Sequence, residues 1–396
     1  MLHTDPITIQ FIQEHLHDDT NKLLLAAKKY QQVDIPFVVG QIRARLQIKD
    51  KLPEWYACKD LIIPSRISAE QCSSALTAAY KQRLVKGDSV CDLTGGLGVD
   101  TYYLAQKTVK SYYIERFDSY CEAARHNLPL LGVNHVEIIQ GDCRDMLLSL
   151  PDVGCFYIDP ARRGDANKRL FAINECEPDV LAMKTVLLEK ATRLIIKVSP
   201  MADIVHTLQL LPETSQVHIL SVRNECKELL FVLDRERSQQ PNIYCINYRS
   251  DGTEDSFVFT LQQEHQTDIP ISENVKKYLY EPNASILKAG AFRSVAHLFG
   301  LLKLHVNSHL YTSNQLLPHF PGRGFEVHSI IDFSSKNIKK LSDSIPKANI
   351  TVRNFPLKVE QIRTKTHIKE GGENYLFATT LSNDQKVLID TFKIMQ

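Results

Sequence analysis

The chain has 396 residues, of which 43% are hydrophobic and 23% are charged. This composition is typical of a globular protein with several domains and excludes a chain that is disordered throughout. The formal net charge is +1, so no overall field predicts nucleic acid or a membrane surface as a partner, and any basic binding site has to be local. No apolar run approaches the ~18 residues of a membrane span, and the first residues lack a secretory pattern. We therefore expect a cytoplasmic protein without membrane contact.

Nine cysteines are scattered singly along the chain, and no C-x-x-C pair occurs. An odd number of cysteines without paired spacing predicts neither a disulfide framework nor a zinc site. We expect reduced thiols, most of them buried, and no bound metal.

The first 65 residues show helical periodicity, with Asp19 or Thr20 and Asp34 as helix starts. Over about 66–235, short apolar runs alternate with helical stretches, which is the pattern of a mainly parallel α/β sheet. A helix over residues 68–84 precedes the first run, and the last two runs are close enough to pair as a hairpin. The predicted strands are Ser89–Asp92, Lys110–Ile114, Val136–Ile139, Cys155–Ile158, Arg193–Val198, Val217–Val222 and Leu229–Leu233.

Residues 236–320 predict a middle domain. A hairpin turns at Asp251-Gly252, and a mostly helical stretch follows over residues 275–302. The region from about 321 to 396 alternates strand, helix, strand, helix and two further strands. This order predicts a small α+β domain at the end of the chain.

The most informative stretch is VCDLTGGLGVDT at residues 90–101. A predicted strand runs into Gly95, Gly96 and Gly98, and a helix begins directly afterwards. Glycines at such a turn let a ligand lie on bare main chain next to a helix N-terminus. The stretch therefore predicts a ligand-binding bend.

Acidic residues end the first three predicted strand regions: Asp92, Glu115 and Asp142. The carboxyl ends of parallel strands meet at one edge of a sheet, so we expect these three side chains to share that edge. A carboxylate at the end of the second strand can accept both hydroxyls of a ribose. An acid at the third can reach the edge of an adenine.

The glycine pattern separates two classes of nucleoside cofactor. The dinucleotide fingerprint G-x-G-x-x-G needs a third glycine, and Thr101 stands there instead. Asp92 would also repel a pyrophosphate. A carboxylate beside the bend suits a ligand with an amino group and a sulfonium centre, which points to S-adenosylmethionine.

In these motifs, together with Asp159-Pro160-Ala161-Arg162-Arg163, residues 66–235 resemble the class I S-adenosylmethionine-dependent methyltransferases. The resemblance implies a Rossmann-like seven-stranded sheet with an antiparallel last strand and helices on both faces. It also implies the cofactor contacts. The methionine part would lie against Asp92, Gly95, Gly96 and Gly98, the ribose against Glu115, and the adenine against Asp142 and Cys143. Thr94 and Arg116 are further cofactor-binding candidates.

The whole chain is similar to a narrower bacterial group that carries a THUMP-like C-terminal domain. The most distinctive segment is RNFPLKVEQIRTKTHIKEGGENYLF, at residues 353–377. The resemblance implies four parts: an N-terminal helical region (1–65), a class I methyltransferase domain (66–235), a ferredoxin-like middle domain (236–320) and a THUMP-like α+β domain (321–396).

The fourth predicted strand ends in DPARRG, at the edge where methyl transfer takes place in enzymes that methylate bases. Asp159 can accept a hydrogen bond from an N–H or O–H nucleophile, or act as its base, and Pro160 fixes the backbone direction. Arg162 and Arg163 can clamp a substrate phosphate. These four are the catalytic candidates, against the alternative of a solvated Arg-rich loop.

The same motif leaves the methylated atom open. Ala161 and Arg162 replace the Pro-aromatic pair of the amino-group methylators, and the uracil C5 methylators need a cysteine where this chain has Lys197-Val198-Ser199. Lys197 and Ser199 can line the pocket, or be a snorkelling lysine and a turn serine. Gln71 and Ser73 are further pocket candidates, with a plain packing helix as the alternative.

From Pro321 onward the chain has 12 Lys/Arg against 8 Asp/Glu. With the THUMP-like resemblance, this small surplus favours structured RNA, rRNA or tRNA, as the substrate. The alternatives are a small-molecule or protein substrate, and a non-catalytic RNA-binding factor; a nicotinamide-dependent oxidoreductase is disfavoured. The basic candidates are Lys336, Lys339, Lys340, Arg353, Lys358, Arg363, Lys365 and Lys369, with Phe355 and Tyr375 as stacking candidates.

Overall fold

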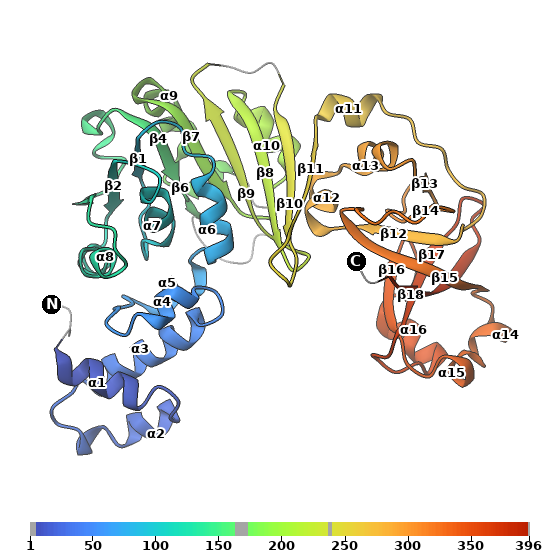
Figure 1. Cartoon of the computed structure of the whole chain (residues 1–396), viewed down its shortest axis with the longest axis horizontal. Helices are drawn as coiled ribbons and strands as arrows, with labels where there is room; N and C mark the ends of the chain where they lie inside the picture. The colour runs from blue at the N-terminus through green and yellow to red at the C-terminus, as the bar shows by residue number, and fades with distance from the viewer. Residues whose placement is uncertain (1–4, 163–172, 237–239, 395–396) are drawn as a thin grey trace. The chain divides into compact units, whose positions relative to one another are not determined.

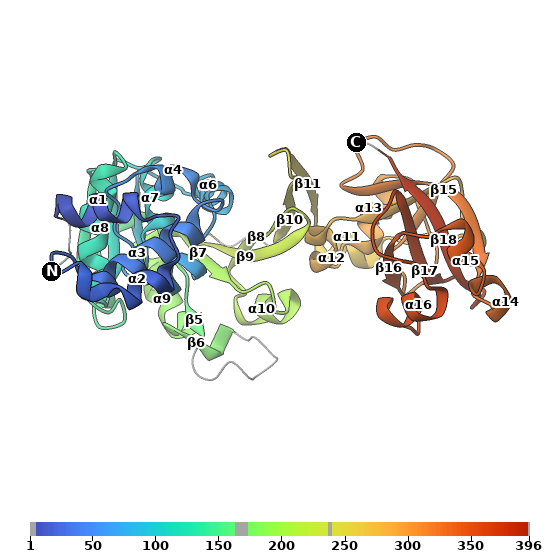
Figure 2. The same cartoon turned by 90° about the horizontal axis from the view of Figure 1, so that it is seen from below.

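The computed structural model describes residues 5–162, 173–236 and 240–394 (Figures 1 and 2). The chain forms two compact units, one of Met1–Gln216 with Leu229–Gln239 and one of Val217–Glu228 with Gln240–Gln396. Within the described residues, none of the helices has the length and apolar character needed to cross a membrane.

The N-terminal part of the first unit is helical, as predicted. Asp19 and Asp34 cap two of its helices, because their carboxylates accept hydrogen bonds from backbone N–H groups of the first turn. Thr20 is the first helical residue and not the cap. The helices are α1 (Pro6–Glu14), α2 (Thr20–Leu25), α3 (Ile35–Ile48) and α4 (Pro53–Ala57), with the 3-10 turn η1 (Ala27–Lys29) after α2.

The prediction of a single helix over residues 68–84 is wrong, because the helix is interrupted. The chain forms two helices, α5 (Arg66–Gln71) and α6 (Ala75–Gln82). Ser74 starts the second helix, because its hydroxyl accepts the backbone N–H of Thr77. The break leaves Ser73 between the two helices.

The main sheet has nine strands in the order β11-β10-β8-β9-β7-β4-β1-β2-β3. Strand β1 pairs in parallel with β2 and β4, and β9 runs antiparallel to β7, so the predicted open sheet with an antiparallel last strand is confirmed. The strands are β1 (Ser89–Asp92), β2 (Lys110–Glu115), β3 (Val136–Gln140), β4 (Val153–Ile158), β7 (Ala191–Val198), β8 (Thr214–Val222), β9 (Glu225–Asp234), β10 (Asn242–Tyr248) and β11 (Glu254–Phe259).

The sheet has two strands more than the seven that the resemblance implies, namely β10 and β11. They form the predicted hairpin around Asp251-Gly252, where Gly252 has a φ of +86°. This hairpin extends the main sheet next to β8. The helices between the parallel strands are α7 (Val99–Ala105), α8 (Asp118–Leu130), α9 (Val180–Lys190) and α10 (Ile204–Leu210), with the short elements η2 (Leu147–Ser149), β5 (Ala161–Arg162), η3 (Ile173–Glu175) and β6 (Cys176–Glu177).

The second unit contains a seven-stranded sheet in the order β13-β14-β12-β15-β18-β17-β16. The mostly helical stretch predicted at 275–302 is partly wrong, because β12 (Tyr278–Pro282) is a central strand with fully buried Leu279 and Tyr280. The strand and helix order predicted from about 321 is confirmed. The remaining elements are α11 (Leu261–Gln266), α12 (Ala284–Ala289), α13 (Phe292–Leu298), β13 (Leu302–Lys303), β14 (Tyr311–Ser313), β15 (Gly322–Asp332), α14 (Ser335–Ile338), α15 (Leu341–Ser344), β16 (Asn349–Arg353), α16 (Val359–Thr366), β17 (Asn374–Thr380) and β18 (Lys386–Lys393).

Candidate active site

The sheet brings the predicted acids to one edge. Asp92 ends β1 and Glu115 ends β2, while Asp142 follows β3 and Asp159 follows β4 directly. These four strands are neighbours and run parallel, so their carboxyl ends lie side by side. The edge therefore combines four carboxylates with the glycine bend.

The bend requires its glycines. Gly96 and Gly98 have φ values of +53° and +87°, which side chains disfavour. A Cβ on Gly95 would lie 2.1 Å from a ring carbon of Tyr113. The Tyr113 hydroxyl in turn donates to the carbonyl of Gly96 at 2.6 Å. Tyr113 of β2 thus fixes the backbone of the bend, and helix α7 begins directly after Gly98.

Asp92 is fully buried beneath this bend. Its carboxylate accepts the hydroxyl of Thr101 at 2.6 Å and the backbone N–H of Thr94 at 3.0 Å. Burial raises the pKa of Asp92 to about 7, although both hydrogen bonds oppose that shift. Thr101, which the sequence marked only as the missing third glycine, is therefore a partner of the acid.

Glu115 lies on the other side of the bend. Its two carboxylate oxygens accept the backbone N–H groups of Gly96 and Phe117, both at 3.0 Å. These bonds aim the half-buried carboxylate at the bend, and each oxygen keeps a further lone pair for a hydroxyl group. The position agrees with the ribose contact that the resemblance implies.

Asp142 is held by a partner that the sequence did not reveal. Arg144 binds it through a two-pronged contact, with Nε and Nη2 at 2.9 and 2.6 Å, and the hydrogen bonds from Arg144 lower the pKa of Asp142. Glu177 forms ion pairs with Arg144 at 2.6 Å and with the exposed Arg116 at 3.4 Å, and so connects the two arginines. The next residue, Cys143, is buried, and burial raises the pKa of its thiol to about 12.

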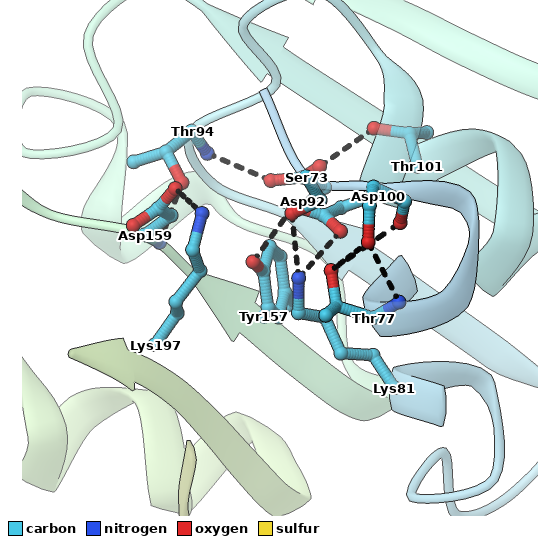
Figure 3. A network of polar contacts seen from close by, with 11 residues as sticks. Ser73, Thr77, Lys81, Asp92, Thr94, Asp100, Thr101, Tyr157, Asp159 and Lys197 are labelled. Atoms are coloured by element: carbon cyan, nitrogen blue, oxygen red, sulfur yellow. Dashed lines mark hydrogen bonds and ion pairs between the residues drawn. The ribbon is translucent and has the colours of Figure 1, made fainter. Parts of the chain in front are cut away.

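Asp159 faces a lysine at the reacting edge (Figure 3). Its Oδ2 lies 2.6 Å from Nζ of Lys197, and its backbone N–H donates to the Thr94 hydroxyl at 2.7 Å. Thr94 therefore ties the glycine bend to the end of β4. Pro160 is buried next to it.

Of the two arginines of DPARRG, the structure describes the backbone of only one. The backbone of Arg162 belongs to β5 and pairs with Cys176. Arg163 lies outside the described residues. Their expected role at a substrate phosphate stays a prediction.

A buried ionic cluster lies next to these residues (Figure 3). Asp100 accepts hydrogen bonds from Lys81 at 2.8 Å, from Ser73 at 2.8 Å and from Tyr157 at 2.9 Å. Lys81 also donates to Ser73 at 2.6 Å. Burial alone would raise the pKa of Asp100, but the charges of Lys81 and Lys197 bring it down to about 2. We name Ser73, Lys81, Asp100 and Tyr157 the Asp100 cluster.

The sequence pointed to only one member of this cluster, Ser73. An acid in the first turn of α7 is a recognisable signal for Asp100. Lys81 and Tyr157 carried no comparable signal, because a lysine on a helix and a tyrosine in an apolar strand are common. Gln71 is exposed at the end of α5, and the hydroxyl of Ser199 accepts the N–H of Met201 in a turn.

The donor set fits S-adenosylmethionine. The bend offers bare main chain at Gly96, where a Cβ would meet only the Thr94 carbonyl oxygen at 3.8 Å. The carboxylates of Asp92 and Glu115 accept backbone N–H groups of the bend. A carboxylate beside the bend complements a cationic ligand, whereas it would repel a pyrophosphate. Among the residues placed by the structure, no group of three or more His, Cys, Asp or Glu side chains has the geometry to hold a metal ion.

Comparisons with known proteins identify the family and two of the domains. Residues 278–321 match a ferredoxin-like domain, and residues 322–391 match a family described as THUMP domain-like. A crystal structure of a protein from Porphyromonas gingivalis W83, named as a methyltransferase, is 37% identical, and the match covers 100% of both chains with a TM-score of 0.91. An uncharacterised S-adenosylmethionine-dependent methyltransferase of Mycobacterium tuberculosis is 22% identical over 310 residues, 76% of this chain and 79% of that protein.

Proposed function

We propose that this chain, which belongs to the family of S-adenosylmethionine-dependent methyltransferases with ferredoxin-like and THUMP-like C-terminal domains, methylates a structured RNA. The methyltransferase activity and the cofactor follow from the family. The substrate class, the roles of individual residues and a cytoplasmic location are our proposal.

One observation supports the site assignment above all others. The bend is open at Gly96, where a Cβ would meet only the Thr94 carbonyl oxygen at 3.8 Å, and the carboxylates of Asp92 and Glu115 accept backbone N–H groups of this bend. When bound, S-adenosylmethionine supplies a methyl group on a sulfonium centre. Asp92 would stabilise the positive charge of the methionine part through the bend, and Glu115 would accept the ribose hydroxyls.

The other residues follow the same edge. Asp142 and Cys143, with Arg116 nearby, would border the adenine. Asp159, fixed by Pro160 and Thr94, would face the nucleophile next to the methyl group. Arg162 and Arg163 would bind a substrate phosphate.

The C-terminal domain supports RNA as the substrate. Lys336, Lys339 and Lys340 are exposed around α14 and can contact phosphates. Lys358, Lys365 and Lys369 are also exposed. Two further candidates are engaged inside the protein: Arg353 contacts the buried Glu281 at 2.8 Å, and Arg363 donates to backbone carbonyls.

Calorimetry of the full chain with S-adenosylhomocysteine tests the site. We expect Asp92→Ala and Glu115→Ala each to weaken binding at least ~10-fold, since each removes a contact worth about 1.5–3 kcal/mol. Glu137→Ala, an exposed acid on β3, is the control and should bind like the wild type. Wild-type affinity in both site variants would overturn the assignment.

Labelling with tritiated cofactor tests the substrate. Total RNA from cells that lack the protein should accept methyl groups, and protein and small-molecule fractions should not. Label in either of those fractions alone would identify the rival methyltransferase functions. RNA binding without transfer to any fraction would identify a non-catalytic factor.

A further inference from the structure

Lys197 forms a close ion pair at the reacting edge. Its Nζ lies 2.6 Å from Oδ2 of Asp159, and the lysine side chain is only 14% exposed while the aspartate is 38% exposed. Figure 3 shows the two side chains pointing toward each other, next to Thr94. The lysine therefore approaches Asp159 from the interior side, and the aspartate keeps a solvent-accessible face.

The sheet fixes this pairing. Strands β4 and β7 run parallel with Ile158 opposite Ile196, so the residues that follow, Asp159 and Lys197, meet at the same level. The Asp159 backbone N–H is bound by Thr94 at 2.7 Å. Both the main chain and one carboxylate oxygen of Asp159 are thus held by the protein. Within the part of the chain that the structure describes, the second oxygen, Oδ1, has no hydrogen-bond partner, and we expect it to face a substrate.

The other charged groups around the pair belong to two elements. Asp92 at the end of β1 and Asp100 in α7 are both negative; Asp159 raises the pKa of Asp92, and Lys197 lowers that of Asp100. Without Lys197, the negative charge of Asp159 would lie near two further acidic side chains, and β7 would supply no cation to balance it. The lysine is therefore the cation that pairs with Asp159 at this edge.

We propose that Lys197 is a positioning residue that holds Asp159 as a carboxylate with Oδ1 aimed at a substrate N–H or O–H group, so that the methyl acceptor is nitrogen or oxygen and not carbon. The inference rests on the proposed function, because it names the nucleophile of that same site. A lone pair of the acceptor forms the new bond to the methyl carbon, and the electron pair of the broken C–S bond stays on sulfur. The acceptor proton passes to the Asp159 carboxylate and then to water.

The thiols near this edge do not favour carbon methylation through a covalent enzyme intermediate, which needs a reactive thiolate. Burial raises the pKa of Cys72, the thiol whose charge interacts with Lys197, and raises that of Cys143, which follows Asp142, to about 12. A carboxylate that accepts a proton, as proposed for Asp159, agrees better with a methyl acceptor that loses a proton from nitrogen or oxygen.

The kinetics of RNA labelling by the full chain test the role of Lys197. In Lys197→Met, Oδ2 of Asp159 loses its partner and the carboxylate is no longer held in place, so kcat should fall ~10-fold while the KM for S-adenosylmethionine stays unchanged. Lys197→Arg keeps a cation at the same place and should restore most of kcat. Lys184→Met is the matched control, because Lys184 pairs with Glu213 at 2.5 Å with exposed fractions of 14% and 33%. A kcat of Lys197→Met equal to that of the control, or no recovery in Lys197→Arg, would overturn the proposal.

Two further readouts separate this inference from the substrate proposal. A crystal structure of the full Lys197→Met chain needs no substrate: the Asp159 carboxylate should leave the position that it has in the wild type, and an unmoved carboxylate contradicts the inference. Mass spectrometry of the labelled nucleosides should find N-methyl or O-methyl groups, and a C-methyl product overturns it. If the wild type labels no RNA, the substrate proposal fails while the crystal structure still decides the role of Lys197.

Discussion

Asp92 is the residue on which the proposed cofactor site depends most. It is buried below the glycine bend, with Thr101 and Thr94 as hydrogen-bond donors, and burial raises its pKa to about 7. A carboxyl group with a raised pKa is protonated in part at neutral pH, and a bound cation shifts it toward the ionised form. Cofactor binding should therefore release a proton.

We predict that affinity for S-adenosylmethionine rises up to ~10-fold between about pH 6 and about pH 8, as Asp92 ionises in the free protein. Because the folded pKa is raised, ionisation of Asp92 costs stability as the pH rises through about 7. Asp92→Asn should therefore raise the melting temperature more at about pH 8 than at about pH 5, and flatten the pH dependence of affinity. Calorimetry in buffers of different ionisation heat measures the proton release; equal wild-type affinity at both pH values would contradict this account.

At the residue scale, the sequence predicted what backbone geometry demands. Gly96 and Gly98 adopt positive φ, and Gly95 has no room for a side chain. The hold of Arg144 on Asp142 could not be predicted, because it depends on how two flexible side chains meet.

At the scale of elements, the Asp100 cluster joins the helix before the first strand to the helix after the bend. Lys81 of α6 is fully buried and reaches Asp100 of α7 at 2.8 Å. Ser73, placed by the break between α5 and α6, bonds to both. The cluster thereby fixes α7, whose first turn follows directly on the glycine bend.

Lys81→Met should destabilise the protein by about 3–5 kcal/mol, because it leaves Asp100, whose side chain is only 12% exposed, without the cation that binds it directly. The double variant Lys81→Met/Asp100→Asn should recover part of this loss, since the uncompensated charge is gone. Urea unfolding measures both free energies, and Lys184→Met, at a half-exposed pair, should cost ~1 kcal/mol or less. A wild-type unfolding midpoint for Lys81→Met would show that the pair does not stabilise the fold.

Elements were predictable where their own pattern defines them. The alternating and apolar runs of β1 to β4 and β7 to β9 were predicted to within a few residues, whereas the two-residue strands β5 and β6 were not predicted. The hairpin of β10 and β11 was found too, but its pattern does not reveal which sheet it joins. The β12 strand was missed, because burial between β14 and β15 overrides the helical propensity of its neighbours.

At the scale of the whole molecule, the two compact units contain different parts of the proposed function. The first contains the glycine bend and the acids that face it, and the second contains the THUMP domain-like region of residues 322–391. No fold argument alone identifies RNA as the substrate, because function depends on the residues of a site and not on the architecture. The exposed lysines around α14 provide such residues.

We predict that Lys336→Glu/Lys339→Glu/Lys340→Glu weakens RNA binding and lowers its salt dependence, since each lost phosphate contact reduces the slope of log K against log salt by about 0.7–0.9. Cofactor affinity should not change. The control Lys22→Glu/Lys28→Glu/Lys29→Glu makes the same charge change at exposed lysines of the N-terminal helices. Filter binding at several salt concentrations distinguishes the two; equal losses in both variants would reveal an effect of net charge alone.

A crystal structure of the full chain with S-adenosylhomocysteine tests the central claim most directly. We predict that the ligand lies on the main chain of Gly95 to Gly98, with its ribose hydroxyls on Glu115, its adenine between Asp142 and Cys143, and its sulfur on the side of Asp159. A ligand bound elsewhere, with Asp92 and Glu115 still contacting only the protein, would contradict the claim.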